Sequence, residues 1–224
     1  MNETNKIMQI HSYDILKVSE LNITSLSQIG NVNIAPAGTA VFDPNKTDAS
    51  KVVENNGTRI RSIAEEYKSS MTDIGVNKGK IYFEAEWTVK QQDIYRAGFG
   101  ISDNTFDWTL HLPMTQTNII SWTSTINNIY IQGSTISGAS WYSVPIVLGM
   151  AVDIPNKLVW FMQNGTWLNG GNPSAGTGGE SFTLNTPLYI WGYTYYIDDY
   201  IDFYFDNWNY TPPTGFESPS HSLI

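Results

Sequence analysis

The sequence has no cysteine and few charged residues. The absence of Cys from its 224 residues excludes disulfides, thiol catalysis and metal sites built on cysteine. Charged residues make up 15% of the chain, against about 25% in a typical soluble domain. Asparagine, threonine, serine, glycine and aromatic residues take their place. This composition is common in all-β proteins that have a polar, uncharged outer surface.

Positive charge is scarce, especially in the second part of the chain. After Arg96 the only basic residue is Lys157, while nine residues are acidic, so this part carries a formal charge of −8. The whole chain carries −9. Nucleic-acid binding needs lysines and arginines that displace counterions. We therefore expect no nucleic acid among the partners, and the charge is equally unsuited to anionic membranes.

Long apolar runs and metal-binding motifs are also missing. No run of about 18 apolar residues occurs, so we expect no membrane insertion. The opening "MNETNKIMQIHSYDILK" lacks the apolar core of a signal peptide, which predicts synthesis in a cytoplasm. His11, His111 and His221 are isolated and form no HxH or HExxH pattern. We predict neither a metal site nor a cofactor.

The sequence does contain many short alternating or apolar stretches. In "GKIYFEAEWTV" the residues Ile81, Phe83, Ala85 and Trp87 share one face, and Tyr82, Glu84, Glu86 and Thr88 share the other. A period of two predicts a strand with one buried face. The stretches "RAGFGIS", "IVLGMAVD", "KLVWFMQNG" and "YIDFYFDNW" predict further strands. Strands separated by Gly, Pro and Asn turns favour an all-β antiparallel sandwich.

Two turns and one glycine-rich loop connect these predicted strands. "SKVVE", "NNG" and "TRIRSIA" read as a hairpin, and Asn164-Gly165 predicts a type I′ turn. Gly171 and Gly176 have the spacing of a phosphate-binding loop, but Thr177 stands where that loop requires lysine. A strand-like stretch follows instead of a helix. We interpret 168–179 as a display loop after a hairpin.

Four carboxylates gather near the end of the chain, at Asp198, Asp199, Asp202 and Asp206. Glycoside hydrolysis uses two carboxylates at a set separation, and calcium also prefers such groups, although the spacing of an EF-hand is missing. One interpretation is a solvated loop and strand face. The other is a contact to a polar ligand or an ion.

Aromatic residues in loop-like segments are the candidate binding residues. Tyr and Trp beside Asn, Asp and Gly make adaptable binding surfaces, and flat rings stack on sugars. The alternative for each ring is packing in the core or at its rim. The candidates are Trp141, Tyr142, Trp167, Asn169, Tyr193, Tyr195, Tyr196, Asp198 and Asp199.

The order of these pieces resembles the SPRY domain. Its hallmark strand, turn and strand correspond to Gly149–Asp153 and Leu158–Gly165. A branch of SPRY-like domains in bacteriophage virion and tail proteins is closer, with matches at "FDPNKT", "IGVNKGK", "GNP", "GT" and "YTPPTGF". The resemblance implies a bent sandwich of two antiparallel sheets over 41–216, after an attachment segment 1–40 and before a tail 217–224.

The resemblance also implies a function. SPRY domains bind partners through loops at one edge and are not enzymes. We expect a phage virion structural protein on the particle exterior, in a tail fibre or a host-receptor or glycan recognition component. Residues 1–40 would bind other virion proteins, and the chain would form a homo-oligomer, a trimer in a fibre. The alternatives are a capsid decoration or structural tail protein, and a glycan-processing enzyme using Asp198–Asp206.

Overall fold

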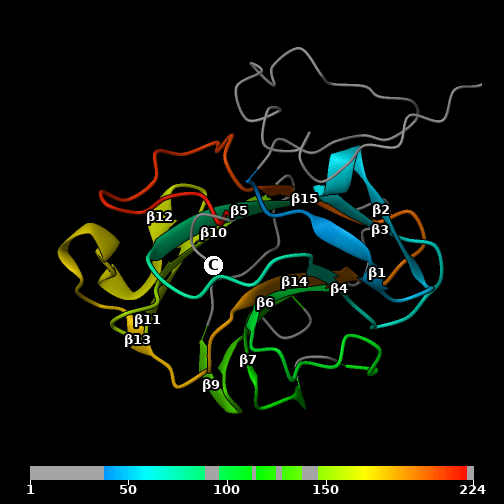
Figure 1. Ribbon diagram of the computed structural model, residues 1–224, viewed down its shortest axis with the longest axis horizontal. Coiled ribbons are helices and arrows are strands. Elements are labelled where there is room, and N and C mark those ends of the chain that lie inside the picture. The colour runs from blue at the N-terminus through cyan, green and yellow to red at the C-terminus, as the bar shows by residue number, and fades with distance from the viewer. Residues whose placement is uncertain (1–37, 89–95, 113–114, 125–127, 138–145, 221–224) are drawn as a thin grey trace, which may run out of the picture. The chain divides into compact units, whose positions relative to one another are not determined.

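The chain folds into two antiparallel β-sheets that pack against each other (Figure 1). The computed structural model describes residues 38–88, 96–112, 115–124, 128–137 and 146–220, all within a compact unit that spans Ala35–Ile224. The sequence-based prediction of an antiparallel β-sandwich is confirmed.

The sheets differ in their strand order but share the antiparallel pattern. Sheet 1 runs in the order β1 (Phe42–Thr47), β4 (Ser70–Thr72), β14 (Tyr189–Thr194), β6 (Ala97–Ser102), β7 (Ile119–Thr123), β8 (Asn128–Ile131) and β9 (Ser134–Ser137). Sheet 2 runs in the order β12 (Thr166–Trp167), β11 (Leu158–Gln163), β10 (Ile146–Asp153), β5 (Lys80–Thr88), β15 (Tyr200–Tyr204), β3 (Arg59–Ser62) and β2 (Lys51–Glu54), with β13 (Glu180–Ser181) also paired to β11.

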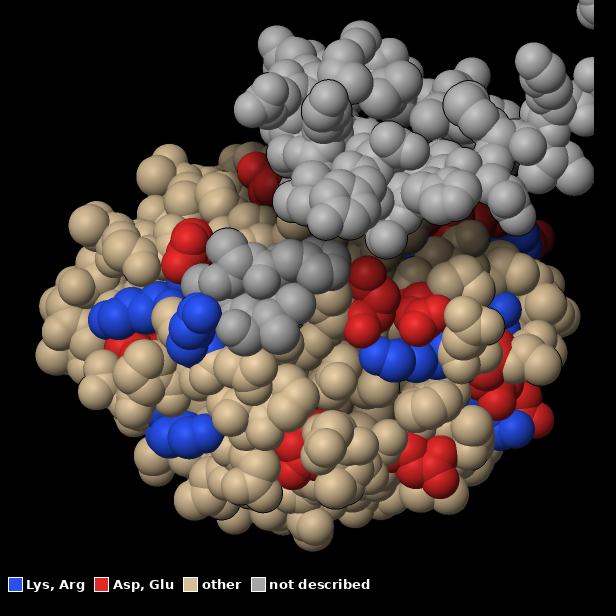
Figure 2. Space-filling view, viewed as in Figure 1, with Lys and Arg blue, Asp and Glu red and all other residues tan. Residues whose placement is uncertain are grey.

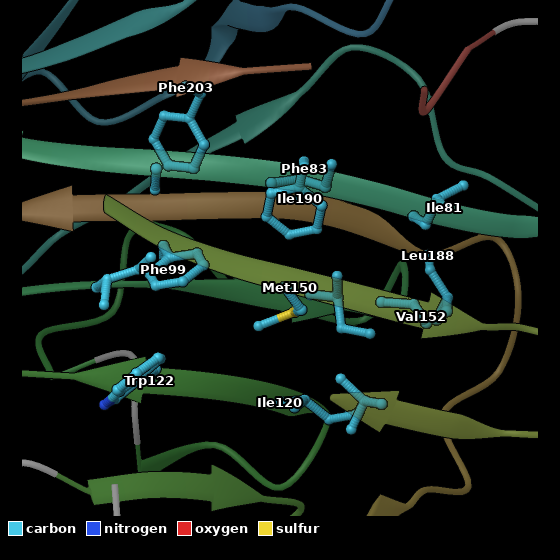
Figure 3. Close-up of a cluster of buried hydrophobic side chains, with 14 of the residues drawn as sticks. Ile81, Phe83, Phe99, Ile120, Trp122, Met150, Val152, Leu188, Ile190 and Phe203 are labelled. Atoms are coloured by element: carbon cyan, nitrogen blue, oxygen red, sulfur yellow. The ribbon is translucent and has the colours of Figure 1, made fainter. Parts of the chain in front are cut away.

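The core lies between the sheets and comes from the inward positions of the alternating strands (Figure 3). Phe83 of β5 and Met150 of β10 meet Phe99 and Ile190 of the opposite sheet, and each is at most 2% exposed. Burying one such side chain contributes about 1.5–3 kcal/mol. The inward face predicted for β5 is confirmed, and the stretches of β6 and β15 form strands as predicted.

The outer face of β5 differs from the prediction. Alternation placed Tyr82 and Glu84 toward solvent, but both are 0% exposed. The closing segment 205–217 crosses this face, and Glu84 accepts hydrogen bonds from the backbone N–H groups of Asn209 and Tyr210. Trp208 packs 5.6 Å from the Tyr82 ring, centroid to centroid. A strand's own pattern carries no information about a distant segment that covers it.

The hallmark motif has a packing reason in this fold. Gly149 lies opposite Glu84 in the β10–β5 pairing. A Cβ at that position would approach the Tyr82 hydroxyl to 3.1 Å and the Met162 methyl to 2.7 Å. Glycine therefore leaves room for the covered outer layer. At the end of β10, Asp153 accepts hydrogen bonds from Asn156 and pairs with Lys80 at 2.8 Å, which holds the turn to β11.

Both predicted hairpins are present. Asn164 and Gly165 have φ values of 45° and 79°, as a type I′ turn requires. The β2–β3 hairpin turns through a short 3-10 segment, η2 (Asn55–Gly57).

The glycine-rich loop is anchored to the domain. It forms the 3-10 turns η4 (Leu168–Gly170) and η5 (Pro173–Ala175). Asn172 and Thr177 exchange two backbone hydrogen bonds, and the Trp160 indole N–H donates to the Thr177 carbonyl at 2.8 Å. These amides already have partners within the loop. This agrees with the interpretation of 168–179 as a display loop and not as a phosphate-binding loop.

Pairing continues past Phe216 into the stretch expected as a tail. Glu217 exchanges backbone hydrogen bonds with Lys80 and Tyr82, and the Ala40 amide donates to the Pro219 carbonyl. Residues 217–220 thus contact the sandwich, while the domain boundaries expected at 40 and 216 stay predictions. In the ranges described above, no helix is both long and apolar enough to cross a membrane.

Candidate functional site

The candidate binding residues lie in three different places. Trp141 and Tyr142 lie outside the described residues. Trp167 and Asn169 lie at β12 and η4, beside the outer face of sheet 2. The remaining candidates lie in β14 and in the loop 195–199 that joins β14 of sheet 1 to β15 of sheet 2.

Two of the candidates are buried, contrary to their expected place in an exposed loop. Tyr193 lies in β14 and is 0% exposed, with its ring stacked on Trp191 at 6.2 Å. Asp199 is also 0% exposed. The apolar pattern of "GYTYYIDDY" did not reveal that β14 extends to Thr194 with a second aromatic layer on its outer side. Neither side chain offers a surface to a ligand.

Trp167 and Asn169 take different positions. The Trp167 ring is half-buried and packs 6.1 Å from Tyr82, so it forms part of the covered outer layer. Asn169 is exposed, with a φ of 52° in the left-handed region. A binding role for either stays a prediction.

The base of the β14–β15 loop is held by a buried hydrogen-bond network. The Ser62 hydroxyl lies 2.6 Å from the Thr194 carbonyl and 2.8 Å from the Thr194 hydroxyl. The Thr194 hydroxyl reaches the Asp199 carbonyl at 3.1 Å. Backbone bonds join Ser62 to Asp198 and Asp199. The network fixes the loop against β3, so residues 195–198 project from a rigid base.

Three tyrosines lie next to one arginine at this loop. The Arg96 guanidinium carbon lies 4.8 Å from the Tyr195 ring centroid, 5.5 Å from that of Tyr67 and 5.8 Å from that of Tyr196. The Tyr67 and Tyr195 rings are 4.4 Å apart, and Tyr196 meets Tyr195 edge-on at 5.1 Å. We call Tyr67, Arg96, Tyr195 and Tyr196 the arginine–tyrosine cluster. It presents rigid aromatic surface together with a positive charge.

The Arg96 guanidinium has a different environment from those of the other described arginines. Arg59 holds Asp202 at 2.6 Å, and Arg61 holds Glu54 at 2.7 Å. These hydrogen bonds raise the pKa of both guanidinium groups. The buried Nε of Arg96 has no hydrogen-bond partner in the described part of the chain. Its neighbours are aromatic faces, which attract a cation by about 0.5–2 kcal/mol.

The rim of the cluster is polar and mixed in charge. His111 lies with its Nδ1 3.4 Å from a Glu66 carboxylate oxygen, and its ring meets Tyr67 edge-on at 5.2 Å. Asp198 pairs with Arg61 at 3.1 Å. Ile197 is 52% exposed. Burial raises the pKa of Tyr67, and Arg96 opposes that shift.

Sequence reasoning found Tyr195, Tyr196 and Asp198 but missed Arg96, Tyr67 and His111. Arg96 directly precedes a predicted strand, where it looked like an ordinary flanking charge. It reaches the loop because β6 pairs with β14 and the Tyr195 amide donates to the Arg96 carbonyl. The pairing of distant strands leaves no local signal in the sequence.

The remaining carboxylates lie beside a separate cavity of about 480 Å³. Asp202 and Asp206 line it together with Arg59, Tyr204 and the η2 turn. Asp202 accepts two hydrogen bonds of 2.6 Å from Arg59, and Asp206 accepts one from Thr39 at 3.3 Å. Within the described ranges, no group of three or more His, Cys, Asp or Glu residues is placed to hold a metal ion.

Charge on the surface is dispersed. Figure 2 shows small blue and red groups interspersed with neutral residues on the face in view. A field of one sign does not extend across that face. On that face, attraction of a charged ligand must therefore come from particular side chains.

Comparison with known proteins identifies solved structures that have a similar fold. No protein-family model and no curated protein match the sequence. The SPRY domain of human HERC1 matches with a TM-score of 0.56 and 17% identity, over 72% of this chain and 96% of that one. The TRIM65 PSpry domain matches with a TM-score of 0.54 and 10% identity, over 74% and 92%.

The stonustoxin structure also matches, with a TM-score of 0.54 and 13% identity, over 74% of this chain and 27% of that one. At these identities the likeness concerns architecture alone. The chain has the fold of a SPRY domain, with the arginine–tyrosine cluster at the loop that joins its two sheets.

Proposed function

We propose that this protein is a non-enzymatic structural component of a bacteriophage virion that recognises the host surface, a receptor or a glycan, through its SPRY-like domain. The arginine–tyrosine cluster is the observation that carries this proposal. The half-buried Tyr195 and Tyr196 lose little conformational entropy on binding and offer both an apolar face and a hydroxyl. The clamped loop base holds them in place before a ligand arrives, which lowers the cost of association.

The assignment to a phage rests on sequence resemblance. "FDPNKT", "GNP" and "YTPPTGF" are the stretches that resemble the virion and tail branch. In this proposal residues 1–40 attach the domain to other virion proteins, and the protein forms a homo-oligomer, a trimer in a fibre. It is made in the host cytoplasm and displayed on the particle exterior. Fold likeness alone does not establish function, so the proposal needs a direct test.

Binding to intact host cells tests the role of the cluster. Labelled wild-type protein is compared with Tyr195→Ala/Tyr196→Ala and with Tyr210→Ala, a half-buried tyrosine of the closing segment. We expect the double variant to bind host cells about 10-fold or more weakly, because central aromatic residues dominate binding energy. Tyr210→Ala should bind like the wild type. Equal binding by all three proteins would remove the cluster from the site.

Immunogold labelling of phage particles separates recognition from capsid decoration. We expect label at the tail or its fibres. Label spread evenly over the capsid would favour a decoration protein that cements neighbouring subunits.

The cavity lined by Asp202 and Asp206 is what favours a glycan-processing enzyme as a second candidate. The geometry is poor for that chemistry, since Arg59 already neutralises Asp202 through two hydrogen bonds. A general acid needs a raised pKa and a free proton. We expect purified protein to release no reducing ends from host polysaccharide. Release that Asp202→Asn abolishes would establish the enzyme instead.

A further inference from the structure

We propose that the arginine–tyrosine cluster is an anion-recognition subsite that binds the carboxylate of an acidic saccharide, such as a uronic acid. The inference deepens the proposed function and rests on it. In this subsite the Arg96 guanidinium pairs with the carboxylate, and the rings of Tyr195 and Tyr196 contact the faces of the sugar.

The first support is that Arg96 has no acidic partner among the described residues. The described region contains all three arginines of the chain. Two of them hold carboxylates at 2.6–2.7 Å, whereas the buried Nε of Arg96 has no partner among the described residues. A guanidinium offers five donors in a fork that fits a carboxylate. Arg96 makes a side-chain hydrogen bond with Tyr67 but binds no carboxylate among the described residues. It therefore retains the acidic partner position that Arg59 and Arg61 have filled within the fold.

The second support is the way in which Arg96 is held. Three tyrosine rings that contact one another in series lie 4.8–5.8 Å from the central carbon of the guanidinium. They position the group without neutralising it. The Nε of the guanidinium is buried, and a hydrogen bond to a charged group is stronger where water is excluded. A guanidinium that is held in place and keeps its charge binds an anion with little rearrangement.

The third support is the balance of charge around the cluster. Arg61 is neutralised by Glu54 and Asp198, and Glu66 faces His111. Among the described residues around the cluster, Arg96 is the cation that holds no carboxylate and remains for a ligand. Because the protein carries −9 overall, long-range attraction does not favour anions. An acidic ligand must be recognised at short range, by a fork of the kind that Arg96 provides.

The aromatic surface favours a sugar over an acidic peptide. Tyr195 and Tyr196 stand at 89° to each other, with ring centroids 5.1 Å apart. This corner offers two flat faces against which the C–H groups of a pyranose ring pack. The cluster is not part of a sheet edge, so it lacks the row of backbone groups that usually binds an extended peptide.

The test measures binding of full-length protein to polygalacturonate, to the same polymer with its carboxyl groups reduced to alcohols, and to polyglutamate. The variants are Arg96→Gln, Arg96→Lys and, as a matched control, Lys46→Gln. Lys46 also lies over a tyrosine ring, 4.5 Å from the centroid of Tyr189, and its loss changes the net charge by the same amount. Thermal unfolding of each variant checks that it is folded.

We expect wild type and Lys46→Gln to bind polygalacturonate equally, and Arg96→Gln to bind at least about 10-fold more weakly, the usual scale for a charged hydrogen bond. Arg96→Lys should fall between them because it keeps the charge but loses the fork. The reduced polymer should bind wild type as weakly as polygalacturonate binds Arg96→Gln. That equality tests a carboxylate contact, since a purely structural role of Arg96 would not produce it.

Three results would overturn the inference. Equal binding by wild type and Arg96→Gln would remove Arg96 from the subsite. Equal binding of the reduced polymer would remove the carboxylate. Binding of polyglutamate, but not of polygalacturonate, in an Arg96-dependent manner would assign the subsite to an acidic peptide. If the wild-type protein still binds host cells in any of these cases, the proposed function stands and only the subsite is rejected. If the wild-type protein does not bind host cells, both the subsite and the proposed function are rejected.

Discussion

Glu84 is a carboxylate in the middle of the molecule with every oxygen engaged. It is 0% exposed and accepts hydrogen bonds from the Tyr82 hydroxyl and from the amides of Asn209 and Tyr210. Burial, followed by the hydrogen bond to Glu84, raises the pKa of Tyr82. Glu84 thus ties the closing segment to β5.

Replacing Glu84 by glutamine tests this role. The side-chain NH₂ group of Gln would face a hydrogen-bond donor that the Glu84 carboxylate now accepts from. An unsatisfied buried polar group costs about 1–3 kcal/mol or more. We expect Glu84→Gln to lower the free energy of unfolding in urea by about that amount. Glu86→Gln is the control on the same strand, since Glu86 is half-buried and accepts from the Tyr204 hydroxyl. A cost for Glu84→Gln no larger than that of the control would contradict the assigned network.

Lys51 is a buried lysine whose titration should appear in the stability of the protein. It is 4% exposed and donates to the Glu66 carbonyl at 2.7 Å. Burial lowers its pKa from 10.5 to about 8. Between these values the unfolded chain binds more protons than the folded one, so the free energy of unfolding rises with pH.

The comparison with Lys51→Met isolates that effect. Between pH of about 7.5 and about 9.5, wild type should gain about 2 kcal/mol relative to Lys51→Met. Other titrating groups are common to both proteins and cancel in the difference. The measurement is chemical unfolding across this pH range. A difference that does not change with pH would show that Lys51 is not buried in the folded state.

At the scale of elements, the hydroxyl of Ser62 joins β3 to the end of β14. Ser62→Ala removes its hydrogen bonds to Thr194 and leaves a buried carbonyl without that donor. We expect a loss of about 1–3 kcal/mol in unfolding free energy and faster amide hydrogen exchange in residues 195–199. Ser70→Ala is the matched control, because Ser70 is equally buried in β4 and its hydroxyl has no partner in the described region. Unchanged exchange in the loop of Ser62→Ala would contradict the clamp.

The elements also show which features a sequence reveals. The inward faces of β5 and β6 and the turn at Asn164-Gly165 were predictable, because alternation and turn chemistry are local. The burial of Glu84 was not, since a segment more than a hundred residues later covers it. Tyr195 and Tyr196 were predictable as binding candidates, but Arg96 joins them only through the pairing of β6 with β14.

At the scale of the whole molecule, both ends of the described region contribute to one sandwich. The contacts of Ala40 with Pro219, and of Glu217 with Lys80 and Tyr82, close it. A fragment 35–224, which spans the compact unit, serves as the reference. A fragment 41–216 should be less stable by about 2–4 kcal/mol, because three backbone hydrogen bonds are lost at about 1 kcal/mol each. Equal stability of the two fragments would show that these contacts contribute nothing.

We propose that the molecule recognises a host surface through the arginine–tyrosine cluster. Competition for adsorption tests this proposal most directly. Host cells are incubated with saturating purified protein, and the phage to which our proposal assigns the protein is then added. We predict that wild-type protein blocks adsorption and that Tyr195→Ala/Tyr196→Ala protein does not. Adsorption that proceeds undiminished in the presence of saturating wild-type protein would contradict the account.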